Sequence, residues 1–252
     1  MGDYITMNGK VVLVTGGARR VGAAIVLAAH GAGARVVIHC NRSRGDADGL
    51  AARLEALRPG SASVVQGDLL DVARLPAMAE AACAAFGRLD ALVNNASSFY
   101  PTPLEHLDPA DWEDLVGSNL RAPAFLSKAV APALRRSRGC IVNIVDIHAE
   151  RPLPGFLAYS VAKSGLAGLT RALAVELAPD VRVNGVSPGA ILWPDDGDSF
   201  PPAERERITV QTPLRRTGGP EDIAGAVKYL LFDAPYVSGQ ILAVDGGRSI
   251  VL

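Results

Sequence analysis

An apolar strand, a glycine-rich turn and an alanine-rich helix follow one another near the start of the chain. Residues 10–15 form an apolar run with the length of a buried strand, and residues 23–30 continue with a helical pattern. Between them, Gly16 and Gly22 would let the backbone approach a pyrophosphate beside the free N–H groups and positive dipole of a helix N-terminus. The spacing differs from G-x-G-x-x-G, because Arg20 stands where a middle glycine is common. The segment indicates nucleotide binding, and the alternative is a tight turn with an exposed arginine.

Strand and helix patterns alternate along the rest of the sequence. Apolar runs of strand length recur at residues 34–39, 63–66, 89–93, 140–145, 181–186 and 241–244. Helical patterns separate these runs, at residues 46–57, 72–86, 111–136, 159–177 and 220–232. Such alternation without a linker is typical of an α/β fold with a parallel sheet. We therefore predict a single doubly wound, Rossmann-type domain over residues 1–252, with a seven-stranded parallel sheet.

Composition places the chain among globular proteins and excludes several functions. Hydrophobic residues make up 49% of the sequence, and the net charge of -1 gives no reason to expect a nucleic-acid partner. No apolar run reaches the roughly 18 residues of a membrane-spanning helix, and the N-terminus lacks a secretory pattern. The three cysteines are odd in number and far apart, which favours a reducing compartment. We expect a cytoplasmic protein with no membrane or nucleic-acid partner and no metal site.

The end of the second expected strand carries residues that select the cofactor. In dinucleotide-binding folds an acid at this place binds the ribose 2′-OH, whereas an arginine suits a 2′-phosphate. Arg42 and Ser43 follow the strand here, and no acid occurs before Asp46. This pattern favours NADP(H) over NAD(H), and the alternative is a solvated loop arginine. Asp68 leaves the third strand near the expected adenine, where it could equally cap the following helix.

A tyrosine and a lysine four residues apart, Tyr159 and Lys163, share one face of an expected helix. An ammonium group beside a phenol favours the phenolate, so we expect Lys163 to lower the pKa of the tyrosine from about 10. Such a tyrosine can give or take a proton during a reduction. Asp146 emerges from the strand before this helix, which places an acid at the same sheet edge. The spacing alone also fits an ordinary solvated helix pair.

Two further residues leave alternatives open. Phe99 follows the fourth strand, and its ring either packs inward or stacks on a flat ligand. Asn119 lies on an otherwise apolar helix face and therefore needs a hydrogen-bond partner; the alternative is a capped polar group at the surface. His148 stands two residues beyond Asp146, but a histidine at a strand exit is more often polar surface. We therefore leave His148 out of the catalytic set.

A long irregular stretch is expected after the sixth strand, at residues 190–212. It begins after Pro188 and Gly189 and contains Trp193, three aspartates and several prolines. A structureless loop of this length within a compact domain is usually functional, for example as a lid. We predict that it forms a substrate loop.

Together these segments resemble the short-chain dehydrogenase/reductase family, and the resemblance covers nearly the whole chain. The family motifs present are T-G-x-x-x-x-x-G (Thr15 to Gly22), N-N-A (Asn94 to Ala96), the helical Asn119, Y-x-x-x-K (Tyr159 and Lys163) and P-G (Pro188 and Gly189). The chain departs from the family where a serine normally ends the fifth strand, because Asp146 stands there instead. The resemblance implies a nicotinamide cofactor and a homotetramer built through the long helices.

Three features resemble one branch of that family, the pteridine reductases: Arg20 in the glycine turn, the run N-N-A-S-S-F-Y-P-T-P at 94–103, and Asp146. In that branch Phe99 would stack on a flat pterin opposite the nicotinamide. The resemblance implies cofactor contacts by Gly16, Arg20, Val21, Asn41, Arg42, Ser43, Asp68, Leu69, Asn95, Ala96, Ser97, Tyr159, Lys163, Pro188 and Gly189. It implies substrate contacts by Arg20, Ser97, Phe99, Asp146, Tyr159 and Trp193.

The chemistry of a pterin agrees with the aspartate. A pterin C=N bond needs a hydride on carbon and a proton on nitrogen, and a carboxylic acid can relay that proton if burial raises its pKa. We assign proton delivery to Tyr159 and Asp146, the nicotinamide ribose to Lys163, and to Asn119 a link from Lys163 to a relay water.

The hypothesis is NADPH-dependent reduction of dihydropterins, extending to oxidised pterins or folates. The alternatives are a reductase of a quinone, another flat heterocycle or a carbonyl compound, and a non-catalytic NADP-binding regulator.

Overall fold

Seven parallel strands form one sheet in the computed structural model, which describes residues 8–193 and 200–252. The strand order is β3-β2-β1-β4-β5-β6-β7, which confirms the predicted doubly wound α/β fold. The chain moves outward from β1 to β3 and then crosses to β4 on the other side of β1, so the topological switch point lies between β1 and β4. The strands are Val11–Val14 (β1), Arg35–Cys40 (β2), Ala62–Gln66 (β3), Ala91–Asn94 (β4), Cys140–Ile144 (β5), Arg182–Pro188 (β6) and Ile241–Val244 (β7).

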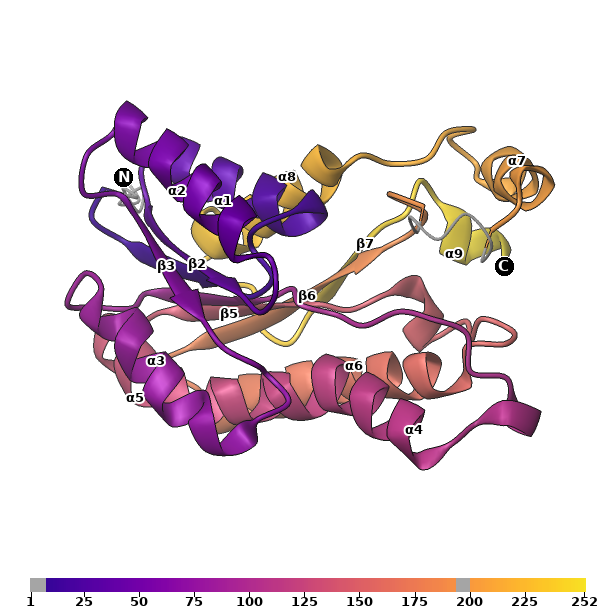
Figure 1. Ribbon diagram of the computed structural model, residues 1–252. Helices are drawn as coiled ribbons and strands as arrows, with labels where there is room; N and C mark the ends of the chain where they lie inside the picture. Colours follow the sequence, from indigo (N-terminus) through magenta and orange to yellow (C-terminus); the bar gives the residue numbers. More distant parts are fainter. Residues whose placement is uncertain (1–7, 194–199) are drawn as a thin grey trace.

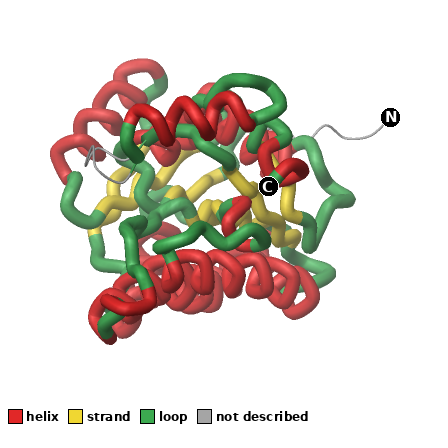
Figure 2. Tube along the Cα trace, turned by 90° about the vertical axis from the view of Figure 1, so that its right-hand side faces the viewer, coloured by secondary structure: helices red, strands yellow, loops and turns green. Residues whose placement is uncertain are grey.

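Helices cover both faces of the sheet (Figure 1; Figure 2 shows the same layers from the side). One layer consists of Arg20–Gly31 (α1), Arg44–Leu57 (α2) and Pro220–Phe232 (α8). The other consists of Leu75–Ala84 (α3), Pro109–Val116 (α4), Ala122–Ser137 (α5) and Leu157–Glu176 (α6). Pro202–Gln211 (α7) and the short Arg248–Val251 (α9) lie together at one end of the molecule. None of the helices in the described part of the chain is long and apolar enough to cross a bilayer.

The strands are apolar throughout because both faces of the sheet are covered. In β1, Val12 and Val14 point into the core beneath α1 and α8, whereas Val11 and Leu13 point into the core beside α3 and α5. Every side chain of β1 is fully buried. A continuous apolar run of this kind is the sequence signature of a central parallel strand.

Two of the predicted elements differ from the structure. The single helix expected over residues 111–136 is divided by a π-helical turn, Gly117–Arg121, which joins α4 to α5. The irregular stretch expected to reach residue 212 is wrong over its second half, because α7 begins at Pro202. This helix buries only Ile208, so its sequence has no apolar stripe to identify it. Residues 194–199 of the predicted loop lie outside the described residues.

A buried carboxylate, Asp90, joins β1 to the start of β4 by a hydrogen bond. It lies at the amino-terminal ends of these strands. Asp90 accepts a hydrogen bond from the backbone N–H of Val11 at 2.9 Å, and it pairs with Arg88 at 2.7 Å and Lys10 at 3.0 Å. Burial alone would raise the pKa of Asp90, but the hydrogen bonds from Arg88, Val11 and Lys10 hold it below its ordinary value. The ionised form is therefore the one that the fold stabilises.

Replacing Asp90 with alanine should lower the free energy of unfolding by about 2 kcal/mol near neutral pH, because the Val11 N–H loses a charged acceptor. An acid with a lowered folded-state pKa contributes stability above its unfolded pKa of about 4 and loses it as the pH falls further. Urea denaturation should therefore show a difference from the wild type that shrinks below about pH 4. Asp48→Ala, which removes only a surface pair with Arg44, is the matched control. Equal losses in the two variants would contradict this account.

Candidate active site

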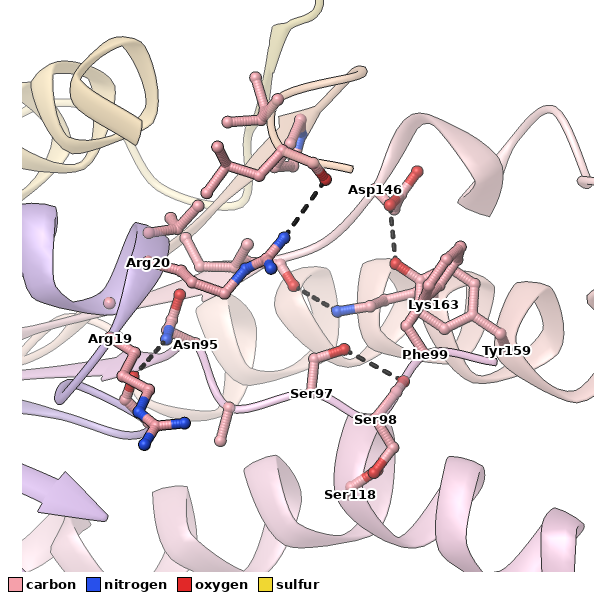
Figure 3. Close-up of a pocket in the computed structure, with 18 of the residues that line it drawn as sticks. Arg19, Arg20, Asn95, Ser97, Ser98, Phe99, Ser118, Asp146, Tyr159 and Lys163 are labelled. Carbon is pink, nitrogen blue, oxygen red and sulfur yellow. Dashed lines mark hydrogen bonds between the residues drawn. The ribbon is translucent and has the colours of Figure 1, made fainter. Parts of the chain in front are cut away.

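A cavity of about 1110 Å³ opens along the carboxyl edge of the sheet, over the switch point between β1 and β4. The segments that follow β1 to β7 all contribute to its walls. Its volume exceeds the roughly 300–1,000 Å³ of a typical small-ligand pocket, so it has room for a dinucleotide and a second small molecule. Figure 3 shows part of its lining.

The glycine turn after β1 brings two backbone segments too close together for side chains. Gly16 has φ +59°, and a Cβ atom at Gly22 would lie 2.1 Å from the Gly16 carbonyl oxygen. Arg20 adopts φ +52°, a left-handed conformation that costs a non-glycine residue roughly 1–2 kcal/mol. Arg20 thus has the left-handed backbone conformation that a glycine adopts easily, although its side chain carries a guanidinium group. This turn, at the N-terminus of α1, fits the pyrophosphate of a dinucleotide.

The side chain of Arg20 extends across the cavity rather than into solvent alone (Figure 3). It donates hydrogen bonds to the carbonyl oxygens of Leu192 at 3.4 Å and Trp193 at 2.9 Å, in the segment after β6. Arg20 is exposed, as the alternative expected, but its guanidinium group also has backbone partners across the cavity. Arg20 connects the glycine turn with the start of the predicted substrate loop.

His39, near the end of β2, joins two of the loops that border the cavity, and the sequence did not identify it. Its Nδ1 accepts from the backbone N–H of Gly16 at 3.2 Å, and its Nε2 lies 3.1 Å from the carbonyl oxygen of Gly67. Burial lowers the pKa of His39 to about 4, so the imidazole is neutral at physiological pH. A neutral ring that accepts at Nδ1 donates at Nε2. His39 therefore connects the glycine turn to the segment after β3.

The cavity wall beyond β2 is formed by the residues predicted to hold the cofactor's adenosine half. Asn41, Arg42 and Ser43 line it, together with Asp68 and Leu69 after β3. Within residues 8–193 and 200–252, Arg42 has no ion pair, whereas its neighbour Arg44 pairs with Asp48 at 2.8 Å. Asp68 accepts from the backbone N–H of Leu70 at 3.0 Å in a tight turn, so it does not cap a helix.

Tyr159 and Asp146 form a hydrogen-bonded pair at the carboxyl edge of β5. The phenolic hydroxyl of Tyr159 donates to Asp146 Oδ2 at 2.7 Å, and Asp146 Oδ1 accepts from the backbone N–H of His148 at 2.9 Å. One turn along α6, Lys163 Nζ donates to the Ile144 carbonyl oxygen at 2.8 Å. Tyr159 is 4% exposed and Lys163 3%, so the expected alternative of a solvated helix pair is wrong.

The pKa of Tyr159 moves in the direction opposite to the one expected from the sequence. Burial and the adjacent Asp146 carboxylate raise it well above its ordinary value. Lys163 Nζ lies 5.6 Å from the centre of the phenol ring, and burial lowers the pKa of Lys163 to about 8. The expectation that the lysine lowers the tyrosine pKa is thus wrong in this arrangement. The phenol keeps its proton and shares it with a carboxylate.

A chain of buried polar side chains holds α6 against the sheet beneath this pair. Asn94 at the end of β4 donates to Asn143 Oδ1 at 2.8 Å, and the Asn143 amide donates to Thr170 at 2.9 Å. Thr170 in turn donates to the Leu166 carbonyl oxygen. Satisfied buried networks of this kind fix one arrangement of the elements that they join. Here they set the position of the helix that carries Tyr159 and Lys163.

Asn119 lies in the π-helical turn, is 1% exposed and does not line the cavity. Its amide donates to the carbonyl oxygens of Ser98 at 2.9 Å and Leu115 at 3.0 Å, and its oxygen accepts from Ser97 at 2.7 Å. The alternative of a surface polar group is therefore wrong. The side chain fixes the segment after β4 to the helix. Its predicted link to Lys163 through a water stays a prediction.

Phe99 combines both alternatives that the sequence left open. Its ring stacks on Phe156 with centroids 4.6 Å apart and meets Tyr159 edge-on at 4.7 Å, yet it is half-buried and lines the cavity. Phe200 lies 6.3 Å from Phe99 and 6.2 Å from Phe156. Rings in contact with opposite faces of Phe99 would be at least about 7 Å apart, twice a carbon–carbon contact of roughly 3.5 Å. Phe156 and Phe200 therefore do not enclose Phe99 between them.

Apart from Asn119, every site residue named from the sequence lines this one cavity. The members not yet described are Val21, Asn95, Ala96, Ser97, Pro188, Gly189 and Trp193. His148, which we left out of the catalytic set, also lines it and is half-buried. Sequence reasoning missed Phe200 and Arg248 in the cavity wall and Phe156 behind Phe99. Phe156 lies three residues before Tyr159, a helical spacing that could have identified it.

Comparisons with known proteins agree with this geometry. A family described as enoyl-(acyl carrier protein) reductase matches residues 16–249. Pteridine reductase 1 of Leishmania tarentolae is 40% identical, with 95% of this chain and 96% of that protein covered. The ketoacyl reductase 2 named for the granaticin polyketide synthase of Streptomyces violaceoruber is 37% identical, with 96% of each chain covered. A 3-oxoacyl-acyl-carrier-protein reductase of Synechocystis is 35% identical, with 96% of this chain and 97% of that protein covered.

The family match begins at Gly16, directly after β1, and extends over the glycine turn, β2 to β7 and the segment that carries Tyr159 and Lys163. The names of the relatives include reductases of different substrates, so the property that these names share is reduction. The chain therefore belongs to the short-chain dehydrogenase/reductase family and is an NAD(P)-dependent oxidoreductase.

Proposed function

We propose that this protein is an NADPH-dependent pteridine reductase that converts dihydropterins to tetrahydropterins and also accepts oxidised pterins or folates. The observation that carries the proposal is the hydrogen bond between Tyr159 and Asp146, at the place where the family normally has a serine. The half-buried ring of Phe99 lines the cavity beside this pair and offers a stacking surface for a flat heterocycle. The 40% identity to a protein named pteridine reductase 1 supports the same substrate class.

The site has the groups that such a reduction requires. NADPH, when bound, supplies a hydride to the carbon of the C=N bond. The ring nitrogen gains electron density as the hydride arrives and must take a proton. The phenol of Tyr159 holds a proton in its hydrogen bond to Asp146, and solvent can replace that proton after each turnover. Because the pKa of Tyr159 is raised, the phenol is protonated throughout the physiological pH range.

Lys163 and Asn119 hold the surroundings of the proton donor in place. Lys163 uses one ammonium hydrogen on the Ile144 carbonyl, which leaves two donors for ribose hydroxyl groups. Asn119 supports the backbone at Ser98, next to the ring of Phe99. Both groups therefore act on the position of the ligands beside the Tyr159–Asp146 pair.

The cofactor residues favour NADPH over NADH. Arg42 and Ser43 line the cavity after β2 and offer a guanidinium group and a hydroxyl to a 2′-phosphate. Arg42 has no ion pair in the described part of the chain and is thus available to an anion, unlike Arg44 with its partner Asp48. Residues 1–252 would then act as one NADP-binding domain with a substrate loop near 190–212. The homotetramer and the cytoplasmic location stay predictions from the sequence.

A carbonyl reductase is the second candidate, because two relatives are named as ketoacyl reductases. A ketone oxygen needs hydrogen-bond donors, and the serine hydroxyl that the family normally offers to it is replaced here by Asp146. A non-catalytic NADP-binding regulator would not need the buried Tyr159–Asp146 pair beside a lysine. These points favour the pterin substrate over both alternatives.

Replacing Arg42 with aspartate should reduce the preference for NADPH over NADH by about 10- to 100-fold, because a charged hydrogen bond is lost and repulsion is added. Dissociation constants for both cofactors, measured by fluorescence titration, test this effect. Arg44→Asp is the matched control, since Arg44 lies two residues away and does not line the cavity. Equal weakening of NADPH and NADH in the Arg42 variant would remove the 2′-phosphate assignment.

Asp146→Ala should lower kcat/KM for dihydropterin by roughly 100- to 10,000-fold, the usual contribution of a positioned acid–base group. NADPH affinity should stay near the wild-type value. Stopped-flow NADPH oxidation separates the two quantities. Asp146→Ser should in addition gain measurable reduction of a simple ketone, since it restores a hydroxyl donor. An alanine variant that reduces dihydropterin at the wild-type rate would exclude Asp146 from the relay.

Tyr159→Phe should remove most of the turnover while leaving NADPH binding intact, because only the hydroxyl that carries the proton is lost. Tyr100→Phe is a matched control. Tyr100 donates to Asp114 at 3.0 Å in the same kind of pair, but its side chain does not line the cavity. The control should keep activity within about threefold of the wild type. If the two variants lose activity equally, Tyr159 is not the proton donor.

A further inference from the structure

A buried arginine at the far end of the cavity has no role in the reaction described above. Arg248 begins α9, after the last strand, and it is 5% exposed while its side chain borders the cavity. It was not among the site residues predicted from the sequence. Buried arginines are rare unless their charge is paired.

Arg248 lacks such a pair among residues 8–193 and 200–252. Its one hydrogen bond there is a long one, from Nη1 to the Ile208 carbonyl oxygen at 3.3 Å. Among these residues Asp245 makes no ion pair with Arg248, although its charge acts on the guanidinium, and both of its oxygens accept from the backbone N–H groups of Gly247 and Ser249. Burial and the neighbouring Arg207 lower the pKa of Arg248, and the charges of Glu204 and Asp245 oppose this shift without cancelling it. A buried, unpaired cation is costly and is stabilised by an anion that reaches it.

The position of Arg248 lies on the substrate side of the cavity. The glycine turn follows β1, and the residues predicted to hold the 2′-phosphate follow β2. Asp146 follows β5, and the order then continues through β6 to β7, whose end leads to Arg248. Arg248 and Arg42 therefore stand near opposite ends of the carboxyl edge. In Figure 1, α9 lies beside α7 and far from α2. A dinucleotide that extends from Arg42 to Tyr159 ends before it reaches Arg248.

Aromatic side chains line the space on the way to this arginine. Trp193 and Phe200 lie 5.5 Å apart between centroids, and both border the cavity together with Ile208 of α7. A ligand that stacks beside Phe99 and continues toward Arg248 would pass these rings. The combination of an aromatic passage with a guanidinium group at its end is suited to an aryl group that carries a carboxylate.

We propose that Arg248 binds a carboxylate on the tail of the substrate, and that the enzyme thereby prefers pterins with an anionic aromatic tail, such as dihydrofolate, over pterins with a short neutral tail. The proposal rests on the proposed pteridine reductase function. It adds a recognition site at the end of the substrate opposite the reacting ring.

The test compares dihydrofolate with dihydrobiopterin, which share the reacting ring and differ in the tail. Arg248→Met keeps an apolar stem and removes the charge. It should lower kcat/KM for dihydrofolate by about 10- to 100-fold, the effect of one charged hydrogen bond, with the loss mainly in KM. The value for dihydrobiopterin should change less than about threefold. Arg248→Lys should recover part of the loss, and Arg135→Met on α5, which removes an exposed ion pair with Asp180 and lies outside the cavity lining, should change neither substrate.

A binding experiment with the tail alone separates this inference from the proposed function. Calorimetric titration with p-aminobenzoylglutamate should show binding to the NADP⁺-loaded wild type and none to Arg248→Met. Equal loss of both substrates in the Met and Lys variants would identify Arg248 as a structural support and overturn the inference, as would weakened NADPH binding. If the wild type reduces neither pterin, the proposed function fails. Binding of the fragment by the wild type, lost in Arg248→Met, would then still identify the carboxylate site, and its absence would exclude the site as well.

Discussion

The account depends on the hydrogen bond between a buried phenol and a carboxylate, Tyr159 and Asp146. The Tyr159 hydroxyl lies 2.7 Å from Asp146 Oδ2 in a buried site, and this carboxylate stabilises the protonated phenol. The phenol therefore keeps its proton and does not ionise to a phenolate. That property suits a reaction in which a nitrogen must be protonated as hydride arrives on the adjacent carbon. It suits a carbonyl less well, since the serine hydroxyl that normally donates to a carbonyl oxygen is replaced by the aspartate.

The fold holds this pair in place at the carboxyl edge of the sheet, where the cavity has room for a dinucleotide. Parallel strands place Asp146 after β5, and the chain of Asn94, Asn143 and Thr170 holds α6 so that Tyr159 meets it. On the other side of the switch point, the glycine turn, His39 and the segment after β3 are joined by hydrogen bonds. Satisfied polar contacts at both sides restrict the geometry, and apolar packing in two cores supplies the stability.

The fold and most of the candidate site could be predicted from the sequence, because both depend on local patterns. Apolar runs of strand length and glycines at turns act over a few residues, and the cavity-lining residues follow strands whose ends meet at one edge. What failed depends on long-range packing. The helix α7 buries only Ile208 and has no apolar stripe, and Arg248 joins the cavity through contacts between α7 and α9. The pKa of Tyr159 was misjudged because Lys163 is one neighbour, whereas burial and Asp146 act together.

The substrate class is the central claim to test. The direct measurement is the initial rate of NADPH oxidation with matched concentrations of four compounds: dihydropterin, a 3-oxoacyl thioester, a simple ketone and a quinone. If Tyr159 and Asp146 together deliver a proton to a ring nitrogen, we expect kcat/KM for dihydropterin to exceed that for each carbonyl compound by about 100-fold or more. Rapid reduction of the thioester or ketone, with no consumption of NADPH on dihydropterin, would contradict the account.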